Sequence, residues 1–297
     1  MVTCQLSTSR LLRVGRLLKL LPSARGLLVS GRSVSTSSRR EQQERASPSS
    51  VDADEVRRFS ELAEEWWKEN GSLKALHAFN ELRVPWIRDS LSPSTSSSSA
   101  TIASLKGVKI LDAGCGAGIL CEPLCRLGAD VTGIDAAADC IEAANSHSRL
   151  QEAGLKRQGG SLRYLATTVE DLLEMEAGSY DAVVASEVLE HVEERQAFVR
   201  SCVAAVKPTG GQLIFTTLNK TFWSKWLAIY AAEQLGIVPK GVHDWNKFTS
   251  PQDLALMLEA EGCHVRMIHG VAYNPITNRC SWTSNQRINY ALRAERC

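Results

Sequence analysis

Three closely spaced glycines follow a short apolar run of this 297-residue chain, in the segment LDAGCGAG at residues 111–118. Glycine lets the backbone take positive φ angles and approach a ligand that a Cβ atom would keep away. Asp135 ends the next predicted strand, where a carboxylate can accept hydrogen bonds from both hydroxyls of a ribose. Together the two features predict a ribose-containing ligand at the carboxyl ends of the strands, a common position for ligands in open α/β sheets. A plain turn is the alternative interpretation.

Asp112, directly before the glycines, is a further candidate. A carboxylate there could fix the amides of the loop or lie near a cationic group of the ligand. The glycine spacing is GxGxG, which differs from the GxGxxG of dinucleotide sites.

A second group of reactive side chains, Glu187, Glu190 and His191, lies in the segment SEVLEH at residues 186–191. If a helical turn begins there, the three share one face. Two carboxylates and an imidazole can bind a divalent cation; Mg²⁺ prefers oxygen ligands, whereas the histidine also allows Mn²⁺ or Zn²⁺. The alternative is a solvated acidic helix start that continues through Glu193 and Glu194.

The elements around these residues alternate between strand and helix. The predicted strands are 108–112, 130–135, 162–166, 180–185 and 211–217, with two more near 263–269 and 280–294. Helices are predicted near 117–127, 137–153, 193–206 and 251–261, the last with Ser250 as its cap. This order predicts an α/β fold, a mostly parallel sheet of seven strands with helices on both faces.

An N-terminal helical extension precedes this domain, which covers residues 101–297. Residues 55–90 have helical spacing through Phe59, Trp66 and Trp67, with a break at Asn70-Gly71 and a second helix over about 74–89. The serine-rich residues 92–100 complete a helical cap and flexible loop over 55–100.

The charge is unevenly distributed along the chain. Residues 1–40 carry eight Arg or Lys and no acid, with leucines at roughly helical spacing. This composition is typical of a mitochondrial transit peptide, followed by a linker over 41–54; a disordered basic tail is the alternative. The remainder holds 26 basic and 33 acidic residues, a balance that makes nucleic acid an unfavourable partner.

An aromatic stripe marks an insertion over residues 218–248, with Trp223, Trp226 and Tyr230 on one side. Such a helix could lie in a membrane interface or cover the protein's own core. No segment has the ~20 apolar residues of a membrane span. The nine cysteines include no paired CxxC motifs, so neither a zinc site nor a disulfide framework is expected.

The glycine loop together with Asp135 resembles the first motif of class I methyltransferases, which is close to LDxGCGxG. The resemblance implies a Rossmann-like fold and S-adenosylmethionine as cofactor. Residues 169–171 (VED) resemble the acidic adenine-side motif of that family, although an acidic helix start explains them nearly as well.

Further stretches are similar to the ubiquinone biosynthesis O-methyltransferases of bacteria and mitochondria. They are 66–67, 76–77, Asn80, 82–83, 111–118, Glu187, 189–192, 217–219, 238–241, 243–244 and 273–278. The resemblance implies that four residues contact S-adenosylmethionine: Arg83, Gly114, Asp135 and Ser186. It assigns Glu187, Glu190 and His191 to a Mg²⁺ site.

The implied substrates are a 3,4-dihydroxy-5-polyprenylbenzoate and demethylubiquinol. In the chemistry this suggests, a metal-stabilised phenolate attacks the methyl group, with Glu187 and His191 as catalytic residues and His191 as either ligand or general base. His243 and Asp244 are candidates for the substrate pocket. Peripheral attachment to the matrix face of the inner membrane and a complex with other enzymes of the pathway are also implied.

Two other functions remain open. One is a class I methyltransferase for another small molecule or a macromolecule, which would leave Glu187, Glu190 and His191 without a metal. The other is a non-catalytic scaffold subunit, which would not bind S-adenosylmethionine.

Overall fold

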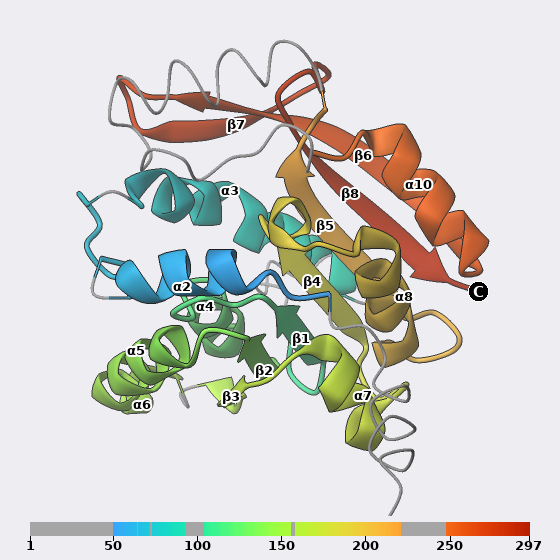
Figure 1. The fold of residues 1–297 in the computed structure, drawn as a ribbon. Helices are drawn as coiled ribbons and strands as arrows, with labels where there is room; N and C mark the ends of the chain where they lie inside the picture. Colours follow the sequence, from blue (N-terminus) through green and yellow to red (C-terminus); the bar gives the residue numbers. More distant parts are fainter. Residues whose placement is uncertain (1–49, 64, 72, 93–103, 156–157, 221–247) are drawn as a thin grey trace, which may run out of the picture. The chain divides into compact units, whose positions relative to one another are not determined.

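Eight strands form one sheet in the computed structural model, which describes residues 50–297 except 64, 72, 93–103, 156–157 and 221–247 (Figure 1). The expected transit peptide, most of the linker, most of the serine-rich loop and nearly all of the 218–248 insertion, with His243 and Asp244, lie outside the described residues. Contacts group Ser47–Cys297 into one compact unit. None of the described helices is both long and apolar enough to cross a membrane.

The strand order is β3-β2-β1-β4-β5-β8-β6-β7. Five parallel strands come first along the chain, and the last three join the sheet antiparallel. Their bounds are β1 Lys109–Ala113, β2 Asp130–Asp135, β3 Ser161–Ala166, β4 Ala182–Ser186, β5 Gln212–Leu218, β6 Cys263–Asn274, β7 Arg279–Thr283 and β8 Asn289–Arg296. The strand order reverses between β1 and β4, so the carboxyl ends of these two strands border the crevice in which ligands of such sheets bind.

The sheet has one strand more than the seven expected. The segment predicted as a single strand near 280–294 divides into β7 and β8, because two side chains form a turn between them. Thr283 Oγ1 accepts from the Asn285 amide at 3.1 Å, and Asn285 Oδ1 accepts from the Arg287 amide at 3.0 Å. Short polar side chains that bind nearby amides in this way interrupt strands. The α/β fold with its mostly parallel sheet is confirmed.

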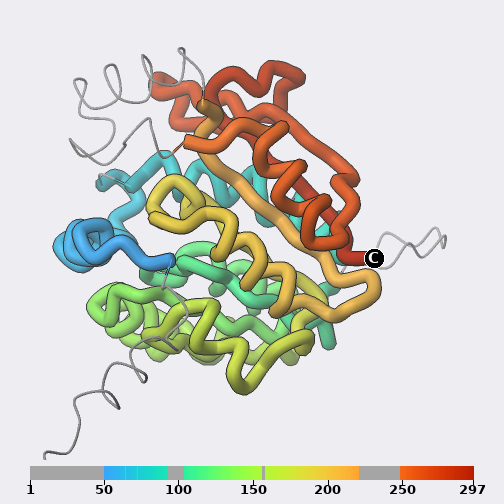
Figure 2. The backbone as a smooth tube through the Cα atoms, turned by 45° about the vertical axis from the view of Figure 1, so that its right-hand side comes forward, coloured from blue at the N-terminus to red at the C-terminus, as the bar shows by residue number. Residues whose placement is uncertain are grey.

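Alternating residues of the strands build two buried layers. Ile110, Val184 and Ile214 face a cluster under α3, α4, α5 and α6, whereas Leu111 and Val183 face the cluster under α7, α8 and α10. The helices are α3 Lys74–Leu91, α4 Cys121–Arg126, α5 Ala138–Leu150, α6 Glu152–Leu155, α7 Val169–Glu176, α8 Arg195–Ala205 and α10 Pro251–Ala260. Both views place α8 beside α10 (Figures 1 and 2). Ser250 caps α10 as expected, accepting from the Asp253 amide at 3.1 Å.

The N-terminal extension contains less helix than the spacing of its apolar residues predicted. Helix α2 spans Ala53–Glu61, and the chain then turns, so the prediction of a helix through Trp67 is wrong. The two tryptophans reach the glycine loop instead: Trp66 covers Gly116, and Trp67 Nε1 donates to the Ala117 carbonyl at 3.1 Å. Contacts some 50 residues away along the chain therefore override the local periodicity.

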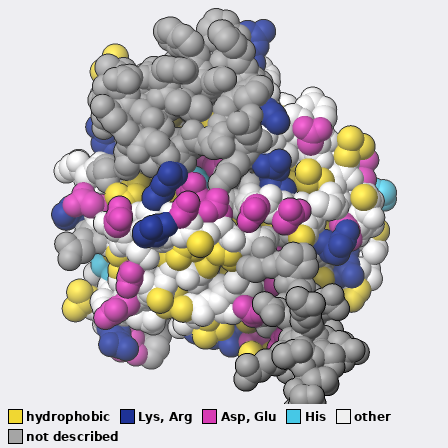
Figure 3. All heavy atoms as spheres, in the orientation of Figure 1, with side chains coloured by type: hydrophobic (Ala, Val, Ile, Leu, Met, Phe, Trp, Pro, Cys, Tyr) yellow, Lys and Arg dark blue, Asp and Glu magenta, His cyan; other side chains and the backbone are white. Residues whose placement is uncertain are grey.

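Acidic and basic side chains of the described residues are interspersed on the face seen in Figure 3, with apolar side chains between them. The charge visible on this face is mixed rather than of one sign.

Candidate active site

A cavity of about 650 Å³ lies at the carboxyl ends of the central strands. Its wall combines the glycine loop after β1, the end of β2, the segment after β4 and residues of α2 and α3. Seven of the residues predicted from the sequence line it: Arg83, Gly114, Asp135, Ser186, Glu187, Glu190 and His191. Two further candidates, His243 and Asp244, lie outside the described residues. The structure thus brings both predicted clusters to one site.

Packing explains the glycines of the loop. Gly114, Gly116 and Gly118 have φ angles of 78°, 52° and 83°, which side chains rarely adopt. A Cβ atom on Gly114 would overlap Val188, and one on Gly116 would overlap the ring of Trp66. The loop also delays the helix, so that α4 begins at Cys121 rather than near residue 117. The missing side chains at Gly114 and Gly116 therefore let Val188 and Trp66 pack directly against the loop.

Asp135 holds this loop from the end of β2. Its carboxylate accepts from the Gly116 amide at 2.9 Å and from the Ala137 amide at 2.8 Å. Burial raises the pKa of Asp135, while these two amides favour the charged form. Each carboxylate oxygen has two lone pairs, so the group can still accept from a ribose hydroxyl. Asp112 is buried as well, and its Oδ2 accepts from the Cys121 thiol at 3.0 Å.

Arg83 reaches the site from α3. It is 3% exposed; its Nε donates to Asn80 Oδ1 at 2.7 Å, and its Nη1 donates to Ser186 Oγ. Burial lowers the pKa of Arg83, and the charges of Asp112 and Glu187 oppose this effect. The guanidinium is thus held in place by neutral acceptors on two elements.

A chain of hydroxyls connects Arg83 to Glu187. Ser186 Oγ lies 2.5 Å from Thr216 Oγ1, which donates to Glu187 Oε1 at 2.7 Å. Glu187 has a φ of 57°, a left-handed conformation that is uncommon for residues other than glycine. Such strained backbone is concentrated at functional sites.

The two glutamates of the second cluster lie close together, with Glu190 buried and Glu187 half-buried. Burial, and next the charge of Glu190, raise the pKa of Glu187 to about 7. Glu190 Oε2 accepts from Thr217 Oγ1 at 2.7 Å, whereas its Oε1 is buried and has no hydrogen-bond partner among the described residues. A second negative charge and an unpaired carboxylate oxygen are features that a bound cation would stabilise.

His191 ends a single 3₁₀ turn, Leu189–His191. Its Nδ1 lies 3.0 Å from Glu55 Oε2 on α2. Burial lowers the pKa of His191, but the hydrogen bond of Glu55 and the charges of Glu190, Glu55 and Glu187 outweigh it and raise the pKa overall.

The predicted helical turn through Glu187 does not form, because the left-handed backbone places this residue before the 3₁₀ turn. Within the described part of the chain, no three His, Cys, Asp or Glu side chains converge as metal ligands. The described residues therefore hold no preformed three-ligand site, and a cation here would be held by the carboxylates of Glu187 and Glu190. Mg²⁺ accepts such an arrangement, since it often binds through one or two carboxylates and keeps several waters.

Glu55 and Tyr164 were not identified from the sequence as contributors to the site. Glu55 stands 136 positions before His191, and the spacing Asp52-x-x-Glu55 is that of an ordinary helix N-terminus. Tyr164 presses its hydroxyl against Gly118 from β3 and looks in sequence like one more strand residue. Long-range pairing gives no periodic signal, so no local pattern could have revealed either residue.

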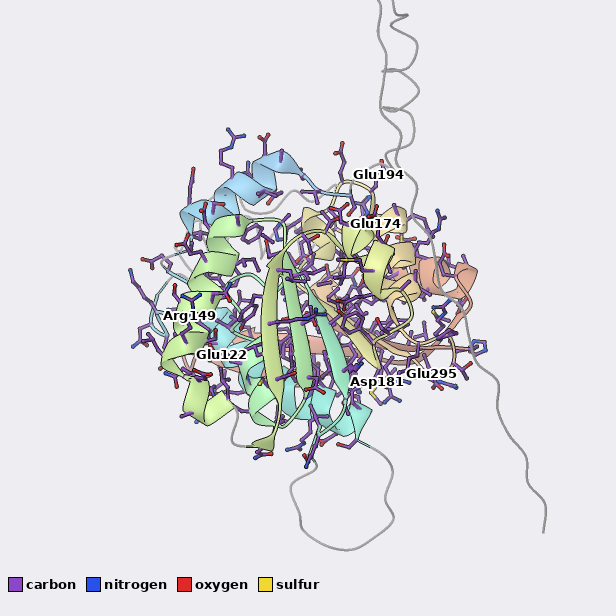
Figure 4. All side chains as sticks on the ribbon, turned by 90° about the horizontal axis from the view of Figure 1, so that it is seen from below. Glu122, Arg149, Glu174, Asp181, Glu194 and Glu295 are labelled. Carbon is purple, nitrogen blue, oxygen red and sulfur yellow. The ribbon has the colours of Figure 1, made fainter. Side chains whose placement is uncertain are left out.

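A cluster of side chains around the buried Glu122 lies next to the glycine loop, away from the cavity. Glu122 of α4, which is fully buried, lies 2.9 Å from Arg126 Nη2 and 2.6 Å from His147 Nδ1 of α5. The His147 ring in turn stacks on Trp67 at 3.4 Å. None of the six charged residues labelled in Figure 4, Glu122 included, lines the cavity. This cluster therefore supports the loop rather than contacting a ligand.

Comparisons with known proteins agree with this geometry. Residues 111–215 match the family model described as a methyltransferase domain. Two solved structures share the fold: the magnesium protoporphyrin IX methyltransferase of Synechocystis with bound SAH (20% identity, TM-score 0.52, 82% of this chain and 93% of that one) and a SAM-dependent methyltransferase of Thermotoga maritima (13% identity, TM-score 0.53, 82% and 100%).

Closer relatives come from curated proteins. The mitochondrial ubiquinone biosynthesis O-methyltransferase of Rattus norvegicus is 46% identical over 83% of this chain and 70% of its own length. For the Homo sapiens protein the values are 44%, 84% and 66%. The ubiquinone biosynthesis O-methyltransferase of Methylobacterium nodulans is 43% identical over 83% of this chain and 96% of its own length. The chain therefore belongs to the ubiquinone biosynthesis O-methyltransferases, which are S-adenosylmethionine-dependent enzymes of the Rossmann-like class I fold.

Proposed function

We propose that this chain transfers the methyl group of S-adenosylmethionine to a ring hydroxyl of polyprenylated catechols, namely 3,4-dihydroxy-5-polyprenylbenzoate and demethylubiquinol. The observation that carries the proposal is that one cavity is lined both by the glycine loop with Asp135 and by Glu187, Glu190 and His191. A donor and an acceptor can bind there side by side, and the resulting proximity supplies much of the rate enhancement of such reactions.

The donor would be bound by the first cluster. Asp135 would accept from its ribose hydroxyls, and the backbone at Gly114 would lie against it without a side chain between. Arg83 would bind the methionine carboxylate, for which a guanidinium has matching geometry. Ser186, which accepts a hydrogen bond from Arg83, holds that guanidinium at the carboxyl end of β4.

The acceptor hydroxyl must lose its proton, because a phenol with a pKa of about 10 is a weak nucleophile at neutral pH. Glu187, with its pKa raised to about 7, and His191 are the groups able to take this proton. Glu187 and Glu190 are also the residues that would hold a divalent cation, Mg²⁺ first of all, and His191 could complete the set. When bound, such a cation would lower the pKa of the catechol hydroxyls.

The location of the enzyme follows from its relatives and its substrate. Two of the relatives above carry mitochondrial names, so we place this chain in mitochondria, with residues 1–40 as the targeting segment. A polyprenyl substrate resides in the bilayer, which favours peripheral contact with the matrix face of the inner membrane through the 218–248 insertion. Other enzymes of the pathway are the expected partners.

The test is methyl transfer from labelled S-adenosylmethionine to a short-tailed dihydroxybenzoate, with and without Mg²⁺. For Glu187→Ala we expect a loss of activity of about 100-fold or more, the scale of a lost acid–base group, while binding of the cofactor is still measurable. Glu193→Ala, an exposed acid of the same segment, serves as the control and should keep full activity. Full activity of Glu187→Ala, or full activity after chelation, would refute the respective assignment.

A further inference from the structure

The first described residues of the chain are joined to the segment that carries His191. Val51 forms an antiparallel bridge with Val192, and the Glu193 amide donates to the Ser50 carbonyl at 2.9 Å. Two adjacent backbone contacts thus fix residues 50–51 beside the position that follows His191. Helix α2 starts two residues later, so its first turn is held at a defined distance from the imidazole.

Two side chains of α2 contact the ring. Glu55 Oε2 lies 3.0 Å from Nδ1 of His191, and the two side chains are only 9% and 11% exposed. Glu55 Oε1 is 3.1 Å from Arg58 Nη1, so the same carboxylate is also paired with a cation of its own helix. One turn further, the Phe59 ring meets the imidazole edge-on at 4.9 Å and 89°. The ring plane and one of its two nitrogens are therefore both determined by α2.

We propose that Glu55 is the positioning residue of His191: it accepts a hydrogen bond from Nδ1–H and so turns the lone pair of Nε2 toward the reaction. This inference rests on the proposed function, but it does not depend on whether His191 takes a proton or binds a cation, because both roles need Nε2 unprotonated at the moment of action. A carboxylate that fixes the tautomer of a working histidine is a recurrent device in metal sites and in acid–base catalysis.

A purely structural reading of Glu55 makes different predictions. As the third residue of a helix with Asp52 as its cap, Glu55 could serve only the helix, by its charge near the N-terminus and its pairing with Arg58. In that case its replacement would lower the free energy of unfolding, but the imidazole would keep its protonation pattern.

The decisive measurement is ¹⁵N NMR of the full-length protein with labelled histidine, without cofactor or metal, at a pH high enough for the His191 ring to be neutral, because the charged ring carries a proton on both nitrogens. The signals of His191 are assigned by their loss in His191→Gln. We expect a proton on Nδ1 in the wild type, its loss or redistribution in Glu55→Met, which keeps the bulk but has no carboxylate, and its return in Glu55→Gln, whose amide oxygen can accept. Glu61→Gln, an exposed acid of the same helix, should match the wild type. A wild-type Nδ1 without a proton, or no change in Glu55→Met, overturns the proposal.

Binding and kinetics give a second readout. In Glu55→Met, kcat with the catechol substrate should fall 10- to 100-fold, the range of lost support to a working histidine. The Kd of S-adenosylmethionine should stay within about twofold, since the Glu55 carboxylate pairs with His191 and Arg58, which do not belong to the glycine loop. Unchanged kcat overturns the proposal. Failure of the wild type to methylate the catechol would refute the substrate instead, while the NMR result would still decide the role of Glu55.

Discussion

Charge at the centre of the cavity is unbalanced at the level of single residues. Arg83, the buried cation, is opposed by the carboxyl groups of Asp112, Glu187 and Glu190, all of them nearly inaccessible to solvent or lining the cavity. Buried like charges raise one another's pKa and favour any cation that enters. S-adenosylmethionine carries its positive charge on the sulfonium that donates the methyl group, whereas its product is neutral at sulfur. The site therefore favours the donor over the product by electrostatics.

Asp112 allows this electrostatic preference to be measured. Burial raises its pKa to about 6, and the Cys121 thiol and Arg83 partly oppose the shift. Below pH 6 the group is protonated and neutral, so the affinity for the cationic donor should fall as the pH decreases through 6, by up to about tenfold if binding shifts that pKa by one unit. Calorimetric titrations at pH 5.5 and 7.5 would measure the change. The affinity for S-adenosylhomocysteine should change less between the two pH values. In Asp112→Asn, the affinity for S-adenosylmethionine should change with pH only by the part that the titration of Glu187 causes. An equal pH dependence for donor and product would contradict this prediction.

At the scale of elements, the turn from β1 to α4 packs so closely against β3 that a side chain at Gly118 would overlap Tyr164. The Tyr164 hydroxyl is buried, has no hydrogen-bond partner among the residues that the structure describes, and would overlap a Cβ atom on Gly118, whose φ is already 83°. Gly118→Ala should therefore destabilise the protein by about 1–3 kcal/mol through backbone strain and overlap.

Tyr164→Phe, in contrast, removes an unpaired polar atom and should be neutral or stabilising by up to about 1 kcal/mol. In the double variant the closest of the three overlaps is gone, although two ring carbons still lie 2.7 and 2.9 Å from the new Cβ atom. This partial relief should couple the two effects by at least about 0.5 kcal/mol. Thermal or urea unfolding of the four proteins measures the coupling. Simple additivity would show that the hydroxyl is not the atom that confines Gly118.

Element order was predictable because each part of it has a local cause. Largely apolar runs such as 108–112 and 180–185 mark buried parallel strands, and the Ser250 cap marks the start of α10. The C-terminal antiparallel strands were less predictable. Strand β6 is longer than predicted, and β7 and β8 were predicted as one strand, because only the side-chain turn near Asn285 separates them. Gly114 and Asp135 were predictable by their fixed places after two strands.

Contacts between distant segments could not be predicted in the same way. Trp66 and Trp67 keep helical spacing but serve the glycine loop, and Glu55 looks like part of a helix cap but pairs with His191. Nothing in the local sequence distinguishes these roles, because their partners lie about 50 and 136 positions away.

At the scale of the whole molecule, the contacts between residues 50–59 and the His191 segment bear on where the catalytic unit begins along the chain. Contacts assign Ser47–Cys297 to one compact unit, and its first described residues already bind the His191 segment. A protein that starts at Ser47 should therefore unfold at nearly the same temperature as the full chain and bind S-adenosylmethionine equally well. The hydrophobic clusters under both faces of the sheet remain complete in it.

Removal of 15 further residues, so that the chain starts at Leu62, should have a different effect. It deletes the bridge to Val192, the carboxylate of Glu55 and the ring of Phe59, but leaves the glycine loop, Arg83 and both tryptophans. We expect kcat to fall at least tenfold, as for the loss of support to a working histidine, with a smaller loss of cofactor affinity. Unfolding temperature, Kd and kcat of the two truncated proteins, compared side by side, decide the matter. Equal kcat values would mean that the first helix only covers the site, whereas a selective loss of kcat would make residues 50–59 part of the active site itself.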